Sequence, residues 1–259
     1  RPRGVLKVTA PTAFSRLHIA PHLPAFLSRF GDIEIEMHLS DNFVDIIRDG
    51  FDVAIRIGEL RDSSLVARKL AADDRVLCAT PGYLAEAGKP KKLADLERHN
   101  CLLAGAQDVW RLEGPEGQVQ ARVKGNIRSN SGEFVREALL SGLGIALRST
   151  WDVGAELEAG QLQVVLPDYR GSTSVSIFAV YPCREFMPNK VNVFIEFLNE
   201  VYAAHPPAER KARVLAATAQ ESQASPVSAQ ANGRGAKPAA TRKAGEINDR
   251  KTKSATPSG

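Results

Sequence analysis

Long apolar runs and cysteines are scarce in this chain of 259 residues. No stretch approaches the roughly 18 consecutive apolar residues of a membrane-spanning helix. The opening RPRGVLKV is not a charged segment followed by an apolar leader. Three cysteines are too few for a disulfide scaffold. Since 43% of the residues are hydrophobic and 25% are charged, we expect one large or two small globular domains and no membrane span.

Motifs of enzymes and metal sites are also missing. The sequence contains no GxSxG, GxGxxG, GxxxxGK[ST] or HExxH pattern. His18 and His22 are four residues apart, but Pro21 lies between them and no third ligand stands at metal-binding spacing. The sequence therefore predicts no enzyme, no metal and no cofactor. The three cysteines lie in or beside apolar strands, so we expect small hydrophobic side chains rather than a redox switch; they are Cys78, Cys101 and Cys183.

The positive charge is concentrated at one end. A net charge of +4 and a pI of about 9.0 suggest a nucleic-acid binder. Residues 203–259 contain ten Lys/Arg and four Asp/Glu, which leaves 24 Lys/Arg and 26 Asp/Glu in residues 1–202. We expect this Ala-, Ser- and Gln-rich tail to be disordered, because it has too few large apolar residues to form a core. Two interpretations stay open for it, a basic arm that attracts phosphates and a solvated extension without a role.

Strands and helices alternate in residues 4–202. Gly4–Ala10, Ile33–Leu39 and Asp52–Gly58 have the pattern of strands, and a helical run lies between the first two, interrupted near Pro21. We expect a second short helix over Asn42–Arg48. This βαβαβ order predicts a parallel sheet.

The rest of the chain repeats the α/β pattern in a second unit. Val76–Thr80 is its first predicted strand, and Pro81–Ala87 its first helix. Val191–Tyr202 is predicted to be a closing amphipathic helix. The sequence thus indicates two α/β units, with the second inserted before the last helix.

Three polar loops follow strands and precede helices: Ala10-Pro11-Thr12, Leu39-Ser40-Asp41 and Ser129-Asn130-Ser131-Gly132. In an open α/β sheet, ligands bind beyond the carboxyl ends of the strands, where helix N-termini offer free N–H groups. Such loops can hold a carboxylate. Each can equally be an ordinary helix cap worth about 1 kcal/mol. Convergence of all three loops on one cleft would favour the ligand interpretation.

Six segments follow one another in a recognisable order: GVLKVTAPTAF (4–14), GFDVAIRIG (50–58), LVARKLAADDRVLCATPGYLAEAG (65–88), NSGEFVREALLSGLGIALRSTW (130–151), VVLPDY (164–169) and FAVYPCREFMPNKVNVFIEFL (178–198). In this order and spacing, residues 4–202 resemble the effector-binding, substrate-binding-like region of LysR-type transcriptional regulators. The resemblance is closest to the branch whose third strand reads DxAIRxG.

The resemblance implies a fold like that of type 2 periplasmic binding proteins, with two Rossmann-like α/β subdomains and a disordered C-terminal tail. Subdomain one would comprise residues 4–76 and 182–202, and subdomain two residues 81–176. The crossover strands would lie at 77–80 and 177–181, and the tail at 203–259.

In the family, a small-molecule effector binds between the subdomains. The resemblance places the effector site at the strand-end loops and predicts that Arg56 supplies the charge for an anionic or aromatic metabolite. Arg56 can alternatively form an ion pair with Asp52 or Asp62. Arg148 stands where many members carry proline, which suggests a further cation near the cleft. The predicted effector-binding residues are Pro11, Thr12, Ala13, Ser40, Asp41, Arg56, Gly58, Asn130, Ser131, Gly132 and Arg148.

The resemblance also implies partners. We expect a cytoplasmic homodimer or homotetramer that binds DNA only through a helix-turn-helix outside these residues, because Arg1 stands where the linker helix of such regulators normally ends. The alternatives are a solute-binding protein of a transport system, which shares the fold, and an enzyme on the same fold. The sequence does not identify the effector, nor does it distinguish an activator from a repressor.

Overall fold

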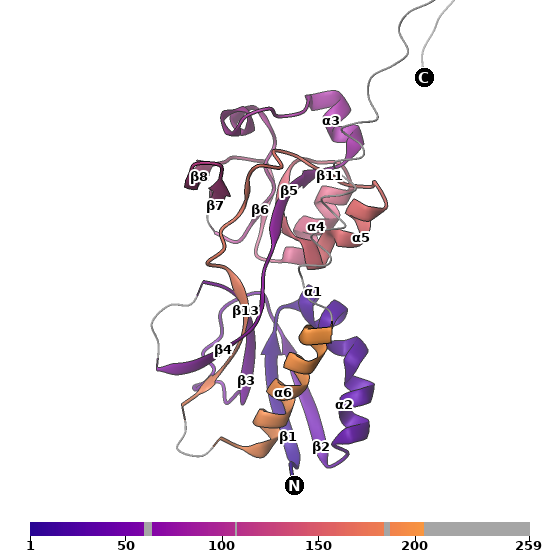
Figure 1. The fold of residues 1–259 in the computed structure, drawn as a ribbon, viewed down its shortest axis with the longest axis vertical. Coiled ribbons are helices and arrows are strands. Elements are labelled where there is room, and N and C mark those ends of the chain that lie inside the picture. The colour runs from indigo at the N-terminus through magenta and orange to yellow at the C-terminus, as the bar shows by residue number, and fades with distance from the viewer. Residues whose placement is uncertain (60–63, 107, 184–186, 205–259) are drawn as a thin grey trace, which may run out of the picture. The chain divides into compact units, whose positions relative to one another are not determined.

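The computed structural model describes residues 1–59, 64–106, 108–183 and 187–204, and its strands form two main sheets (Figure 1). The first sheet has the order β2-β1-β3-β13-β4. Its strands are β1 (Gly4–Ala10), β2 (Ile33–Leu39), β3 (Val53–Gly58), β4 (Leu65–Ala72) and β13 (Ser176–Pro182).

The predicted parallel pairing is confirmed at one side of this sheet. β1 pairs in parallel with β2 along its whole length, from Gly4 opposite Ile33 to Ala10 opposite Leu39. It also pairs in parallel with β3. β13 runs antiparallel to both β3 and β4, so the sheet as a whole is mixed.

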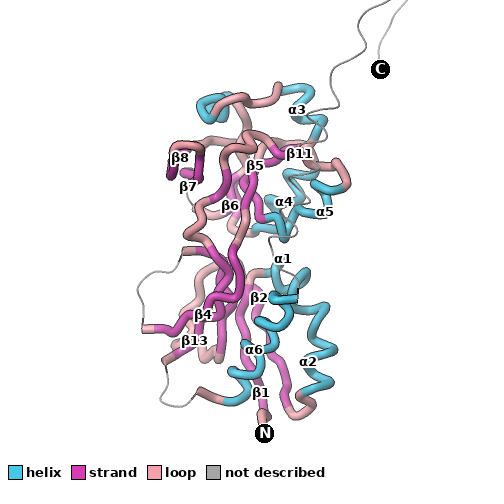
Figure 2. Tube along the Cα trace, in the orientation of Figure 1, coloured by secondary structure: helices cyan, strands magenta, loops and turns pink. Residues whose placement is uncertain are grey.

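The helical run after β1 changes its geometry where the prolines predict a break. It consists of α1 (Thr12–Phe14), a π-helical turn (Ser15–Ile19), a 3₁₀ turn (Ala20–His22) and α2 (Leu23–Arg29). The 3₁₀ turn contains Pro21, which has no N–H to continue the α-helical ladder. Figure 2 shows α1, α2 and α6 (Asn189–Ala204) beside the first sheet. We call this sheet and these helices the first subdomain.

The second sheet has the order β10-β5-β12-β7-β8, with β11 paired to β5. Its strands are β5 (Arg75–Ala79), β7 (Val109–Gly114), β8 (Gly117–Arg122), β10 (Ala146–Ser149), β11 (Gln163–Val164) and β12 (Arg170–Gly171). A small separate pair joins β6 (Leu103–Ala104) to β9 (Arg128–Ser129). The helices are α3 (Pro81–Ala87), a 3₁₀ helix (Leu93–Arg98), α4 (Gly132–Leu140) and α5 (Thr150–Glu158). These elements form the second subdomain.

The chain passes between the two sheets twice, from Ala72 to Arg75 and from Gly171 to Ser176. The expected crossover segments 77–80 and 177–181 lie further along, in and just after β5 and within β13. The structure thus changes sheet a few residues earlier than those segments.

A buried carboxylate marks the first passage. The Asp73 side chain is fully buried and accepts hydrogen bonds from Ser149 Oγ (3.1 Å) and Trp151 Nε1 (2.9 Å). Arg75 Nε lies 3.7 Å from the same carboxylate. The Trp151 ring in turn meets Phe14 of the first subdomain edge to face, with centroids 5.2 Å apart. Asp73 therefore fixes the crossover to the start of α5.

One predicted helix is wrong. Within Asn42–Arg48, residues 42–45 have no regular structure and residues 46–48 form a turn rather than a helix. The Arg56 guanidinium donates hydrogen bonds to the carbonyl oxygens of Asn42 (3.1 Å) and Val44 (3.0 Å). In a helix, these oxygens would accept from backbone N–H groups four residues further along. Residues 40–52, called the 40–52 segment below, are thus an irregular connection held by a strand residue.

The closing helix is confirmed over Asn189–Ala204, slightly longer than predicted. The predicted tail from residue 205 onward lies outside the described residues. Within the described part of the chain, no helix is both long and apolar enough to cross a membrane.

Burial gives the thiols different reactivities. Burial raises the pKa of Cys78 and of Cys101 to about 12, whereas Cys183 is exposed. Because the thiolate is the reactive form, we expect a thiol reagent at neutral pH to modify Cys183 rapidly and the other two only on unfolding. Counting fast-reacting thiols in the native chain, with Cys183→Ser as the control, checks this. Rapid modification of a second thiol would contradict it.

Burial also raises the pKa of Asp73, against the opposing effects of Arg75 and of the two hydrogen bonds. A carboxyl whose pKa is higher in the folded chain stabilises the fold most at acid pH, and this contribution is lost as the pH rises through the folded-state pKa.

Asp73→Asn cannot titrate. We therefore expect wild type to gain in unfolding free energy relative to Asp73→Asn as the pH falls from about 7 to about 4. Urea unfolding across this range measures the difference, and the exposed Asp168→Asn controls for loss of a charge. A loss of unfolding free energy by wild type relative to Asp73→Asn as the pH falls would show that the ion pair with Arg75 outweighs burial.

Candidate functional site

The three polar loops singled out in the sequence meet at one carboxylate. Asp41 follows β2, and its Oδ1 accepts a hydrogen bond from the backbone N–H of Thr12 (3.0 Å), directly after β1. Its Oδ2 accepts one from the N–H of Gly132 (2.7 Å), the first residue of α4. Because β1 and β2 are parallel, their carboxyl ends lie at one edge of the sheet, which brings Thr12 and Asp41 together.

Both donors are the first residues of helical segments. Thr12 begins a run that stays helical through Arg29, and Gly132 begins the nine-residue α4. The first N–H groups of a helix have no partner within it and carry the positive end of the helix dipole. The Asp41 carboxylate satisfies one such group in each subdomain.

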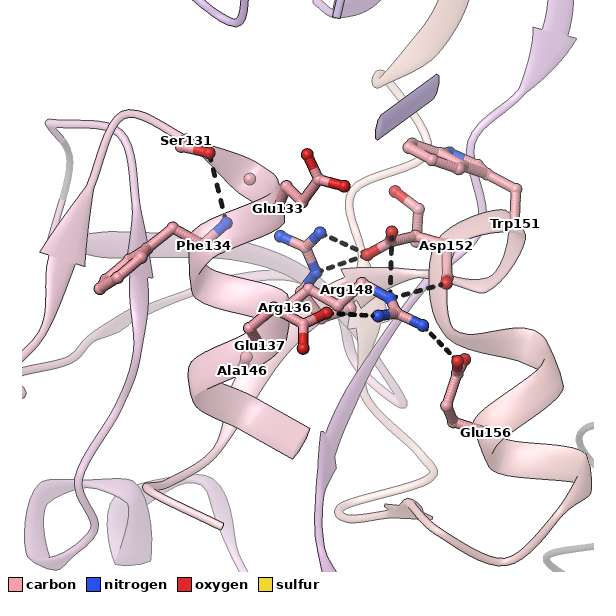
Figure 3. A network of polar contacts seen from close by, with 12 residues as sticks. Ser131, Glu133, Phe134, Arg136, Glu137, Ala146, Arg148, Trp151, Asp152 and Glu156 are labelled. Atoms are coloured by element: carbon pink, nitrogen blue, oxygen red, sulfur yellow. Dashed lines mark hydrogen bonds and ion pairs between the residues drawn. The ribbon is translucent and has the colours of Figure 1, made fainter. Parts of the chain in front are cut away.

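A buried guanidinium lies beside this carboxylate. Arg148, at 8% exposure, comes from β10, and its Nε donates to Asp152 Oδ2 (2.9 Å), as does its Nη2. Arg136 lies on the other side of Asp152 and also bonds Glu156 and Glu137 (Figure 3). Removing one member of a buried ion pair typically costs about 3–5 kcal/mol, so this network holds Arg148 in place.

Gly132 gives both charged groups access to the start of α4. A Cβ atom at Gly132 would lie 3.5 Å from Asp41 Oδ2 and 3.7 Å from both Nη atoms of Arg148. Among the described residues, Arg148 Nη1 donates no hydrogen bond within the protein. The position between Thr12, Gly132 and Arg148 is thus rich in donors and suited to an anion.

Further contacts join the subdomains around this position. Asn130 Nδ2 donates to Asn42 Oδ1 (3.3 Å), and Arg16 Nε to Glu133 Oε1 (3.1 Å). His18 Nε2 lies 3.1 Å from the carbonyl oxygen of Trp151. These pairs link residues more than 80 positions apart in the chain and form polar contacts between the two subdomains.

Arg56 lies elsewhere than at the anion position. Its guanidinium binds the two carbonyl oxygens of the 40–52 segment and stands 5.2 Å from the ring centroid of Phe43. Desolvation by burial lowers its pKa. Asp52, the alternative partner, binds Lys190 Nζ (2.6 Å) instead, and Asp62 lies outside the described residues. Arg56 positions the segment that carries Asp41.

Most other residues of the expected site have local roles. Pro11 precedes α1, and Ala13 is buried in the core. The Ser40 hydroxyl accepts from Asn42 N (3.1 Å), and the Ser131 hydroxyl caps α4 by accepting from Phe134 N (3.2 Å).

Gly58 ends β3 opposite Ser176. Thr12, Asp41, Gly132 and Arg148 are the members that the structure brings together.

Sequence reasoning missed Asn42, Arg16 and Glu133, which join the subdomains. Glu133 stands in the first turn of a helix, where an acidic residue is ordinary and gives no signal. Arg16 is separated from it by 117 positions. These contacts can be identified only once the fold shows which residues of the two subdomains lie side by side.

A separate pocket lies next to Trp151 and is lined by none of the predicted effector-binding residues. It is lined by residues of both subdomains and of the first passage, namely Leu17, His18, His22, Ala72, Asp74, Thr150, Trp151, Ile177, Val201 and Tyr202. Among the described residues, no group of three or more His, Cys, Asp or Glu is arranged to hold a metal ion.

Residues 1–203 match the LysR substrate binding domain. The chain is 39% identical over 210 residues to the HTH-type transcriptional regulator DmlR of Escherichia coli (strain K12), which covers 80% of this chain and 68% of DmlR. The chain thus spans about two thirds of the length of this relative, and somewhat less (64%) of the activator TtdR from the same strain.

Solved structures agree. The regulatory domain of CrgA, a LysR-type transcriptional regulator from Neisseria meningitidis, superposes with a TM-score of 0.69 at 29% identity, over 77% of this chain and 98% of that one. The full-length Vibrio cholerae virulence activator AphB gives 0.65 at 30% identity, over 76% and 68%. The predicted fold of two α/β subdomains of the periplasmic-binding-protein type is confirmed, as is the prediction that the domain is not an enzyme, because the relatives are regulators. The chain belongs to the LysR substrate-binding domain family of transcriptional regulators.

Proposed function

We propose that this domain senses a small anionic metabolite, which binds between the subdomains where Thr12, Gly132 and Arg148 meet, and that it thereby controls transcription by a DNA-binding parent protein. One observation carries the proposal. A carboxylate, that of Asp41, is held there by one N–H from each subdomain, beside a buried guanidinium. Groups arranged in this way recognise a carboxylate whether it belongs to the chain or to a ligand.

Arg148 is the cation in this proposal, and Arg56 contributes through the 40–52 segment. Arg148 already has Asp152 as a partner through Nε and Nη2, so its charge is balanced without ligand. Nη1 leaves one donor for the effector. Ser40 adjoins Asp41 in the chain, and Asn130 and Ser131 directly precede Gly132, so in this proposal their side chains would supply polar contacts to the remainder of the effector.

Binding would act through the contacts between the subdomains. A ligand that contacts both sides binds best to one arrangement of the subdomains and shifts the population toward it. Its effect is limited by the difference in its affinity for the two arrangements. In a homodimer or homotetramer, such a shift would reach the DNA-binding segments.

DNA binding, assembly and a cytoplasmic location belong to the parent protein in this proposal. Support comes from the relatives, which are named HTH-type regulators and of which this chain spans about two thirds. No observation favours the transport alternative. The coding sequence upstream of Arg1 tests the choice, since a helix-turn-helix supports regulation and an export leader supports transport.

Arg148→Lys tests the site. Lysine keeps the positive charge next to Asp152, but its single ammonium cannot bind Asp152 and a ligand in the manner of a guanidinium fork. In a thermal-shift screen of small mono- and dicarboxylic acids, we expect at least one acid to raise the Tm of wild type. Arg148→Lys should weaken binding of that acid about tenfold, which is about 1.4 kcal/mol.

Arg29→Lys is the matched control. Arg29 also pairs with a carboxylate, that of Glu200, but it lies in the last turn of α2 and outside the network around Asp152, so this variant should leave the affinity unchanged. If no acid stabilises wild type, or if both lysine variants bind the acid as wild type does, the proposed site is wrong.

A further inference from the structure

Asp41 stands in a position unusual for an exposed surface carboxylate. Within the described residues, no cation lies within salt-bridge distance of it, and its hydrogen-bond partners are the N–H groups of Thr12 and Gly132. Its two oxygens are divided between the two subdomains, one bond each. The carboxylate of the Asp41 side chain thus makes the contacts that a bound organic acid would make.

We propose that Asp41 is an internal occupant of the effector's anion position, and that an effector binds by displacing the Asp41 carboxylate from Thr12 and Gly132. This rests on the proposed function, since it concerns the same site. The chain itself competes with the ligand, so the affinity of the effector depends on how often Asp41 leaves the two N–H groups.

The backbone around Asp41 allows displacement without unfolding. Before it, Ser40 N donates to the carbonyl oxygen of Ala10 (2.9 Å), next to the end of β1. After it, Arg56 holds the carbonyl oxygens of Asn42 and Val44. Since both sides are anchored and the residue is exposed, rotation of the Asp41 side chain alone can move its carboxylate into water.

Displacement also preserves the link between the subdomains. While Asp41 is bound, its bond to Gly132 joins the 40–52 segment to α4. A ligand carboxylate in its place would make the same pair of bonds and would add Arg148 Nη1, which lies close to the Gly132 backbone. A tethered group competes at a high effective concentration, which lowers the apparent affinity of a free ligand by the fraction of sites left open.

The test uses malonate as a simple anionic probe on the chain as it exists. Asparagine has nearly the shape of aspartate but only one acceptor oxygen, and its NH₂ group cannot accept from a second N–H. We therefore expect Asp41→Asn and Asp41→Ala to bind malonate at least about tenfold more tightly than wild type in calorimetry. Binding should shift the backbone amide resonances of Thr12 and Gly132 in ¹⁵N NMR spectra.

Asp45→Asn is the matched control. Asp45 lies in the same segment and carries the same charge, but its carboxylate caps the N–H groups of Ile47 and Arg48 locally. The Asp45→Asn variant should bind malonate as wild type does, because removal of a negative charge from this segment is not sufficient to tighten malonate binding. Equal affinities in wild type and both Asp41 variants, or tighter binding in Asp45→Asn as well, would overturn the proposal.

A wild-type measurement guards against variants that fail to fold. At saturating malonate, the Asp41 carboxyl carbon should move toward the chemical shift of a solvated side chain, together with the two amides. If the amide resonances of Thr12 and Gly132 shift while the resonance of the Asp41 carboxyl carbon does not, the proposal that malonate displaces Asp41 is wrong.

This result is separable from the proposed function. If malonate binds more tightly to the Asp41→Asn variant but no acid in the screen stabilises wild type, then Asp41 occupies the anion position and the proposed effector function is wrong. If an acid stabilises wild type and binds the Asp41 variants with the same affinity, the effector function is supported and displacement of Asp41 is wrong.

Discussion

The two-subdomain arrangement depends on how the chain leaves the first sheet. At that point it buries a carboxylate, Asp73, and a buried carboxylate must find donors or lose its charge. Ser149 and Trp151 supply them from the second subdomain, while the Trp151 ring packs against Phe14 of the first. One side chain thereby connects the crossover, the start of α5 and the helix after β1. This connection sets where α5 and the helical run after β1 lie relative to the passage.

Local pattern was sufficient for the regular elements. Gly4–Ala10 and Ile33–Leu39 have the predicted bounds because apolar residues recur along both segments and the loops after them contain proline or serine. Pro21 marked the break in the helical run for the same reason, since a missing N–H acts locally.

What the sequence could not reveal depends on partners far along the chain. The 42–48 segment stands between a candidate N-cap pair, Ser40-Asp41, and a helix-ending Asp49-Gly50, but Arg56 on β3 binds two of its carbonyl oxygens. The Asp41 bond to Gly132 spans 91 positions, and nothing in either loop specifies the other. The residue types at the strand ends indicated an anion site. Which cation would face it, Arg56 or Arg148, depended on side-chain direction, which periodicity does not contain.

Trp151 gives this domain a built-in optical probe. The chain has two tryptophans, and the other, Trp110, is buried in a core of the second subdomain. Trp151 instead lies at the border, with its indole N–H on Asp73 and its ring edge to face with both Phe14 and His18. Indole emission depends on the polarity and quenching groups around the ring, and an imidazole close by is such a group. Any relative motion of the subdomains would therefore change the intrinsic fluorescence of the unlabelled protein, with Trp110 as a steady internal reference.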